Sequence, residues 1–93
     1  MAITIEETTV ATVGGWTVTC GNIMRDRFTP EDGAEQEGLT AELGLYDGDG
    51  KAHGEPTVGV GSVVLIDGVP HRVDAVVAGR DGGHGHVALV AVR

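Results

Sequence analysis

The chain has 93 residues, which is enough for one domain and too few for two that fold independently, since domains usually hold roughly 100–150 residues. Its formal net charge of −8, without a basic stripe that interleaves with aromatic residues, argues against direct nucleic-acid binding because acidic surfaces repel phosphate. No window approaches the roughly 20 apolar residues that span a bilayer, and no secretory signal is recognisable, so we expect a soluble, cytoplasmic protein without membrane contact.

We expect residues 1–93 to form a single β domain, because glycine is frequent and valine, threonine and isoleucine dominate between the glycines. A domain of this size buries only about 60–65 % of the surface of its unfolded chain, so association would add useful burial. Cys20 is the only cysteine, which excludes an intramolecular disulfide and favours a reducing compartment.

Charge is distributed unevenly along the chain. Residues 1–50 hold ten carboxylates against Arg25 and Arg27, whereas residues 51–93 hold four acidic and four basic side chains. The acidic half is either a solvated surface that favours solubility or a surface matched to a basic partner.

The first predicted element is a hairpin. Two glycines separate Val13 from Trp16, and such a pair favours a two-residue turn with positive φ. We therefore expect Val13 to pair with Trp16 and Ala11 with Val18. In that register Val18 and Cys20 share one face of the strand with Trp16.

Residues 25–38 interrupt the β pattern, because charged side chains dominate there and Phe28 is almost the only apolar one. This composition predicts an acidic loop. Thr29 and Pro30 are suited to the N-cap and first position of a single helical turn, which Gly33 would end.

Residues 39–46 return to β character, and the sequence Asp-Gly-Asp-Gly at residues 47–50 predicts a turn. The same four residues resemble the start of a calcium-binding loop. Lys51 and Val58 occupy positions of that loop that supply ligands, so we interpret the segment as a tight turn.

The last third of the chain has the clearest strands, at residues 63–66, 69–78 and 86–93, with Asp67-Gly68 as a hairpin turn between the first two. Pro70 predicts that the second of these strands starts at an edge or after a bulge. The last strand is apolar on both faces, which predicts a central position. The whole pattern predicts an all-β fold, a small antiparallel barrel or sandwich of about six short strands.

His84 and His86 have the spacing that places two imidazoles on one face of a strand. A zinc site needs three or four ligands in tetrahedral reach. His53 and His71 could join the pair, and Cys20 or Asp81 could complete such a set. We keep zinc binding by this His-x-His pair as a hypothesis, and no other cofactor is predicted.

Ser62, His71 and Asp74 supply the residue types of a catalytic triad. Ser62 lacks the second glycine of a nucleophile elbow, and Asp74 is placed to form an ion pair with Arg72. Cys20 has no basic neighbour that would lower its pKa, so a buried structural cysteine is expected. We therefore expect no enzyme, with a small hydrolase as a remote alternative.

Residues 58–73, VGVGSVVLIDGVPHRV, and the closing HVALVAV at residues 86–92 resemble a pattern of a family of small, uncharacterised actinobacterial all-β domains. That resemblance covers the last third of the chain and implies no catalytic residues. Similar hairpin patterns occur in small phage and injection-machine accessory proteins.

The sequence thus favours a non-enzymatic structural or protein-interaction module, one that self-associates or joins a larger assembly and whose partners are proteins. A small metal-binding protein that uses His84 and His86 is the alternative.

Overall fold

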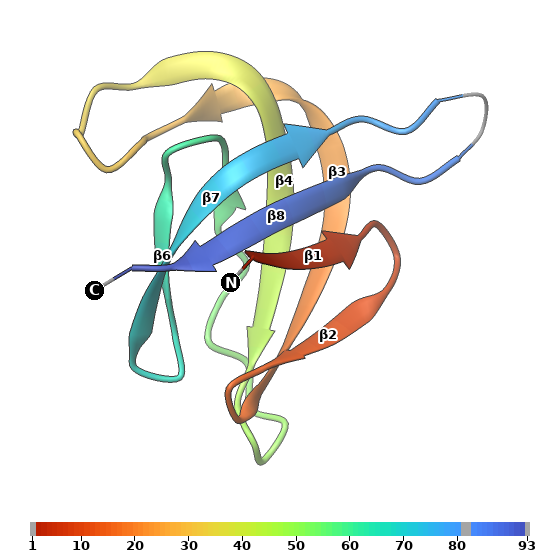
Figure 1. Cartoon of the computed structure of the whole chain (residues 1–93), viewed down its shortest axis with the longest axis vertical. Coiled ribbons are helices and arrows are strands. Elements are labelled where there is room, and N and C mark those ends of the chain that lie inside the picture. Colours follow the sequence, from red (N-terminus) through yellow and green to blue (C-terminus); the bar gives the residue numbers. More distant parts are fainter. Residues whose placement is uncertain (1, 81–82, 93) are drawn as a thin grey trace.

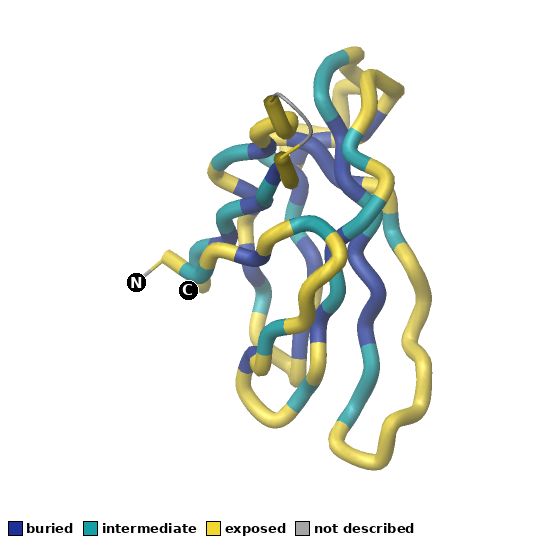
Figure 2. Tube along the Cα trace, turned by 90° about the vertical axis from the view of Figure 1, so that its right-hand side faces the viewer, coloured by how far each residue is buried: buried dark blue, intermediate teal, exposed yellow. Residues whose placement is uncertain are grey.

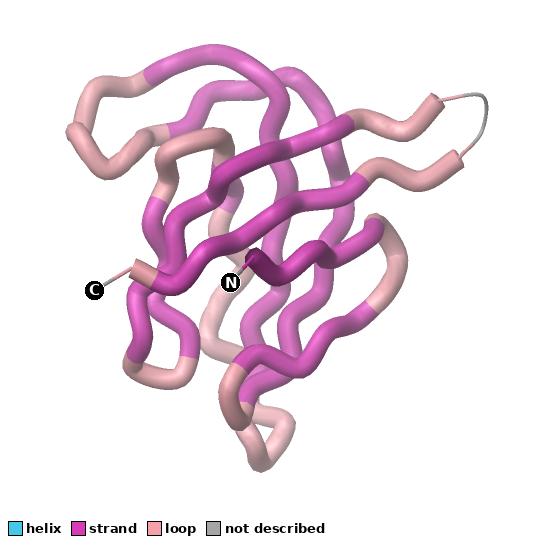
Figure 3. The backbone as a smooth tube through the Cα atoms, in the orientation of Figure 1, coloured by secondary structure: helices cyan, strands magenta, loops and turns pink. Residues whose placement is uncertain are grey.

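Eight β-strands make up the regular structure of residues 2–80 and 83–92, the part of the chain that the computed structural model describes. They are β1 (Ala2–Glu6), β2 (Val10–Val13), β3 (Trp16–Phe28), β4 (Gln36–Tyr46), β5 (Thr57–Val58), β6 (Val63–Ile66), β7 (Val69–Val77) and β8 (His86–Ala91). All strand pairs are antiparallel, and Figure 3 shows only strands and loops. The described residues accordingly include no helix that could span a membrane.

The strands form two four-stranded sheets, in the orders β1-β8-β7-β6 and β2-β3-β4-β5 (Figure 1). The prediction of an all-β, antiparallel fold is therefore confirmed, with eight described strands where about six were expected. The fold is not a closed barrel, because within the described residues no ladder joins the edge strands of one sheet to those of the other.

One of the additional strands comes from the start of the chain. Residues 2–12, in which apolar and polar side chains alternate weakly, are divided between the two sheets. Thr8 has a φ of 65°, and the segment around it changes direction between β1 and β2. The Thr8 N–H donates to the Cys20 carbonyl at 3.0 Å, and the Thr9 N–H donates to the Glu6 carbonyl at 3.1 Å. These bonds satisfy the backbone where the chain passes from one sheet to the other.

The two sheets enclose a single apolar core. The residues that fill it come from both sheets: Ile5, Val64, Ile66, Val73, Val76, Val87 and Leu89 from the first, and Val13, Val18, Cys20, Ala41, Leu43, Leu45 and Val58 from the second. Figure 2 shows these buried stretches in dark blue along the strands, with exposed loops at their ends. Alternation along each strand therefore gives both sheets an outward face that the other described residues do not cover.

The first hairpin has the predicted register. Val13 pairs with Trp16 and Ala11 with Val18, which confirms the expectation from the two glycines. Positive φ is needed only at Gly14, where it is 60°. Val18 and Cys20 are buried and Trp16 packs against the same core, so the predicted face is also confirmed.

The predicted loop over residues 25–38 is wrong at both ends, because β3 continues to Phe28 and β4 begins at Gln36. The predicted helical turn is not formed either. Residues 29–35 make the tip of a long β3–β4 hairpin, in which the Gly33 N–H donates to the Pro30 carbonyl at 3.0 Å and closes a β-turn.

The charged side chains at this end of β3 pair with acidic side chains of β4 and of the hairpin tip. Arg27 Nη1 lies 2.7 Å from Glu35 Oε1, and Arg25 Nη2 lies 4.0 Å from Glu37 Oε1. Opposite charges on facing strands stabilise a sheet without any apolar alternation. A solvent-exposed hairpin of this kind has the composition of a loop.

The Asp67-Gly68 turn is confirmed, with φ of 51° and 77° and with Ile66 paired to Val69. The inference from Pro70 is wrong, because β7 lies between β8 and β6 and its bulge comes later, between Val73 and Ala75. Pro70 faces the end of β8, where a residue without an N–H is tolerated. The Pro70 carbonyl accepts the Val92 N–H there at 2.8 Å. The apolar strand β8 is central, as predicted.

Candidate functional site

The two histidines of the zinc hypothesis lie at one end of β8. His86 is half-buried in the strand, and His84 is exposed in the preceding loop. Asp81 lies outside the described residues, and Cys20 belongs to the core. The described residues contain no group of three or more His, Cys, Asp or Glu side chains that could hold a metal ion. Zinc binding by His84 and His86 stays a prediction.

Gly85, between these histidines, is held by Glu7, the residue that follows β1. Its N–H donates to Glu7 Oε1 at 3.0 Å, and its carbonyl accepts the Glu7 N–H at 2.9 Å. An added Cβ would collide with the Val77 carbonyl and with Ile23. The backbone between the two imidazoles is therefore held in one position by glycine.

The side chains of the hypothetical triad serve structural roles, and Ser62 is the clearest case. Its Oγ donates to the Thr29 carbonyl at 3.1 Å and accepts the Gly59 N–H at 3.1 Å. These bonds attach the loop before β6 to the tip of the β3–β4 hairpin.

His71 and Asp74 also bond elsewhere. His71 is buried, with Nδ1 2.9 Å from the Val69 carbonyl oxygen, whereas Asp74 is exposed and accepts the Arg72 Nε–H at 2.9 Å. The expected ion pair between Arg72 and Asp74 is confirmed. With no shared bond among the three, the geometry lends no support to the hydrolase alternative.

Cys20 is 3 % exposed, which confirms the expectation of a buried cysteine. Burial raises the pKa of its thiol to about 11, and the Glu7 carboxylate adds to that rise. A thiol that stays protonated at neutral pH is a poor nucleophile and a poor metal ligand.

The Asp-Gly-Asp-Gly segment forms a turn, as predicted. Asp47 Oδ1 accepts the N–H groups of Asp49 at 2.9 Å and Lys51 at 3.0 Å, and Asp47 Oδ2 lies 2.8 Å from His53 Nε2. The His53 hydrogen bond, helped by the Lys51 and Asp49 N–H groups, holds the pKa of Asp47 below its usual value. The His53 ring also stacks on Trp16, with centroids 4.4 Å apart. Both carboxylate oxygens are thus used to shape the turn.

The outward face of the β1-β8-β7-β6 sheet carries apolar side chains beside charged ones. Its apolar residues belong to three strands, and together they define what we call the outer apolar face: Val63, Leu65, Val77, Ala88 and Val90. Leu65 is 61 % exposed and Val77 is 42 % exposed. The register aligns Val63, Arg72 and Val90 across β6, β7 and β8. Arg72, which pairs with Asp74, therefore lies between the apolar side chains of β6 and β8 on this face.

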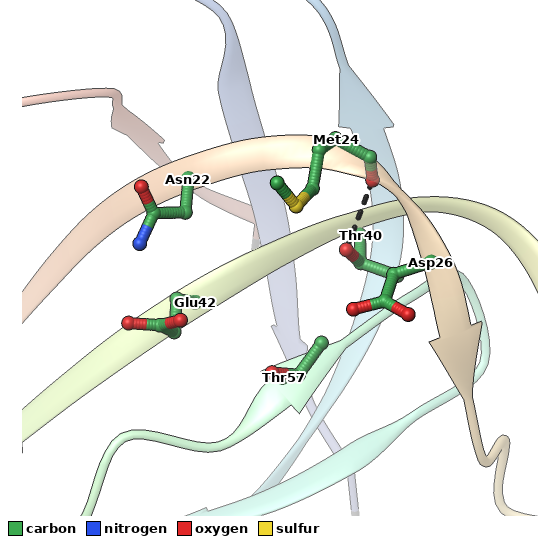
Figure 4. A pocket seen from close by; sticks show the side chains of 6 residues that line it. All are labelled: Asn22, Met24, Asp26, Thr40, Glu42 and Thr57. Atoms are coloured by element: carbon green, nitrogen blue, oxygen red, sulfur yellow. Dashed lines mark hydrogen bonds between the residues drawn. The ribbon is translucent and has the colours of Figure 1, made fainter.

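A second feature lies on the other sheet, in a cavity of about 230 Å³ that we call the hairpin pocket. Its lining residues come from β3, β4 and β5: Asn22, Met24, Asp26, Thr40, Glu42 and Thr57 (Figure 4). The pocket lies where the β3–β4 register shifts between Gly21 and Met24, and Asn22 takes a φ of 49° at that bulge. The bulge bends the hairpin and opens the hollow.

Neither feature was predicted from the sequence. The pocket depends on a bulge and on a register across three strands, for which Gly21-Asn22 is the only local signal. The outer apolar face follows from the strands of the last third, once their inward and outward positions are known.

Comparison with protein-family models, with curated proteins and with solved structures found no match to this chain. The resemblance to small actinobacterial β domains therefore stays a prediction.

Proposed function

We propose that the chain is a non-enzymatic protein-interaction module that self-associates through the outer apolar face. The observation that carries this proposal is the exposure of Leu65, a leucine that points outward from the edge strand β6. Exposed apolar side chains that gather on one face of a small protein mark a candidate contact site. A second copy that covers it would supply the burial that a 93-residue domain lacks.

Charge supports a second copy as the occupant. The chain carries −8 overall, so most pairs of its surfaces repel one another. Among the outward side chains of this sheet, Arg72 and Asp74 form an ion pair, which contributes no net charge. A two-fold contact brings a surface against itself, and a face with the Arg72–Asp74 ion pair at its centre repels its copy less than a surface of unpaired carboxylates would.

Lysine at position 65 tests the contact. Leu65→Lys places a charge in the proposed contact, whereas Val10→Lys places the same charge at a 67 % exposed position of the other sheet. We expect Leu65→Lys to weaken self-association by about tenfold or more, since burying a leucine contributes roughly 1.5–3 kcal/mol. Light scattering across a concentration series measures the change.

The Val10→Lys variant is the control for added charge. It should associate as the wild type does, and both variants should keep the wild-type circular dichroism. Equal association of Leu65→Lys and wild type would contradict the proposal.

A further inference from the structure

β6 is the last strand of its sheet, and no other strand continues the sheet beyond it. Within residues 2–80 and 83–92, β6 forms a ladder with β7 alone and contacts no other strand to a comparable extent. The edge strand at the opposite end of the same sheet, β1, lies beside β2 of the second sheet (Figure 1). The outer edge of β6 is therefore the open edge of this sheet.

The pairing of β6 with β7 determines which backbone groups of β6 are free. Residues that flank a two-residue hairpin turn exchange both ladder hydrogen bonds, so Ile66 and, two residues before it, Val64 bond to β7. Val63 and Leu65 alternate with them, and their N–H and carbonyl groups point away from β7. Pro70 agrees with this alternation, because it lies opposite Leu65 and has no N–H to donate.

β6 carries none of the side chains that usually protect an open edge. Natural edges are protected by charged side chains, proline, bulges or a very short strand. Residues 63–66 are Val-Val-Leu-Ile, and their pairing with β7 has no bulge. The edges of the β3–β4 hairpin carry charged side chains such as Arg25 and Glu37, and β5 has only two residues. The contrast singles out β6 as an edge on which a further strand can add.

A second copy of the chain fits this edge. Two β6 strands that run antiparallel about a two-fold axis at Val64 place Val63 of each copy opposite Leu65 of the other. The free N–H and carbonyl groups of these residues then face one another, and each facing pair exchanges both of its hydrogen bonds. An axis at Leu65 would instead place Val63 opposite Asp67, which belongs to the turn. The axis at Val64 therefore uses all the free groups of the strand.

Side chains and charge favour the same arrangement. The pairing sets the Leu65 side chain of one copy beside the Val63 side chain of the other, and such cross-strand apolar pairs stabilise a sheet. β6 has no charged side chain, although the chain carries a net charge of −8. Two copies therefore repel each other less along β6 than along the charged β3–β4 hairpin.

We propose that self-association joins the β6 strands of two copies edge to edge, antiparallel about Val64, so that their two sheets become one continuous sheet. The inference rests on the self-association proposed above, and it names the strand and the register of the contact. Leu65 then takes part both through its side chain and through its backbone N–H and carbonyl.

Amide hydrogen exchange of the ¹⁵N-labelled full chain tests the pairing without any substitution. One sample is dilute enough for light scattering to give the monomer, and in the other about nine-tenths of the chains are associated. The Val63 and Leu65 amides should exchange about tenfold more slowly in the second sample, because only the free chains leave them open to water. Val10 and Thr12 occupy the equivalent outward positions of β2 and are the controls, whose exchange should not change.

The outcomes separate this inference from the proposed function. Association without slower exchange at Val63 and Leu65 would overturn edge pairing and leave a contact through the outer apolar face. A chain that stays monomeric at every concentration would overturn both. Slow exchange of the two amides already in the monomer would show that the chain covers this edge itself, and equal slowing at Val10 and Thr12 would show a general effect. Either result would overturn edge pairing.

Two variants separate the backbone of Leu65 from its side chain. Leu65→Ala and Leu65→Pro both remove the leucine side chain, but only proline removes the outward N–H, which takes no part in the ladder with β7. Leu65→Pro should weaken association by about tenfold more than Leu65→Ala does, because a two-fold contact loses the bond twice. Val10→Pro is the control on β2 and should associate as the wild type does. Equal association of Leu65→Pro and Leu65→Ala would overturn the proposal, and the exchange measurement decides if Leu65→Pro does not fold.

Discussion

The Gly15 N–H donates a hydrogen bond of 2.8 Å to the carboxylate of Asp67, 52 residues away. Gly15 belongs to the first hairpin turn of one sheet, and Asp67 to the hairpin turn of the other. The two sheets are thus joined at their ends by a polar bond as well as by the core between them. Because Asp67 itself has a φ of 51°, both turns must keep uncommon backbone conformations for the bond to form.

Gly14 is the position where this contact should be most sensitive. A Cβ there would lie 2.9 Å from Asp67 Oδ2, and φ is 60°. Gly33 is the matched control, since its φ is 83° and an added Cβ meets nothing within 4 Å. Gly33→Ala should lower the free energy of unfolding by about 1–2 kcal/mol from backbone strain alone, and Gly14→Ala by more. Urea denaturation measures the free energy of unfolding of both variants. Equal losses would show that the contact with Asp67 adds nothing to the cost of Gly14→Ala.

The core and the outer apolar face should respond differently to the same substitution. Leu43 is fully buried, so Leu43→Ala should lower the free energy of unfolding by about 2–5 kcal/mol. Leu65→Ala should cost at most about 0.5 kcal/mol at a protein concentration where the chain is monomeric, because the side chain faces solvent. A large loss for Leu65→Ala in the monomer would show that Leu65 packs within its own chain.

Asp47 should contribute to stability in a defined range of pH. Its pKa is lowered in the folded state, so its contribution is fully present above the ordinary value of 3.8 and is lost as pH falls through the lowered folded-state pKa. The difference in the free energy of unfolding between wild type and Asp47→Asn should therefore shrink as the pH falls below 3.8. Asp49→Asn is the control, because only its backbone N–H takes part in the turn. A difference that does not change with pH would contradict the role of the carboxylate.

Cys20 should be unreactive in the folded protein, because its raised pKa keeps the thiol protonated and burial blocks access. Between pH 9 and about 11 the unfolded chain loses this proton before the folded one does, so stability should fall with rising pH in that window. At pH 8 a disulfide reagent should label the Cys20 thiol only as fast as the whole protein unfolds. Rapid labelling in native buffer would place Cys20 outside the core.

The zinc hypothesis has a direct test. Site-bound zinc would survive dialysis of the purified protein and would be lost in a variant with His84→Ala and His86→Ala. Less than about a tenth of an equivalent of zinc, measured by elemental analysis after reconstitution, would contradict the hypothesis.

The parts of the fold that follow from local chemistry were predictable. Two glycines between Val13 and Trp16 specified a hairpin and its register, and Asp67-Gly68 specified another. Such turns fix their own pairing, because the loop length sets which residues face each other.

The other parts depend on contacts between distant segments. Residues 25–28 read as loop from their charges, although Arg27 and Glu35 stabilise strand by pairing with each other. The hairpin pocket arises from a register shift after Gly21, and the local signal Gly21-Asn22 does not specify which strands pair there. Division of residues 2–12 between two sheets follows from the left-handed turn at Thr8, a position that propensity assigns to a strand.

Sedimentation equilibrium of the wild-type chain tests self-association most directly. The monomer has a mass of 9.5 kDa, and we predict that the weight-average mass rises with concentration toward a multiple of that value. It should rise further with added salt, which screens the repulsion between two chains of charge −8. A mass of 9.5 kDa at every concentration and salt level would contradict the account.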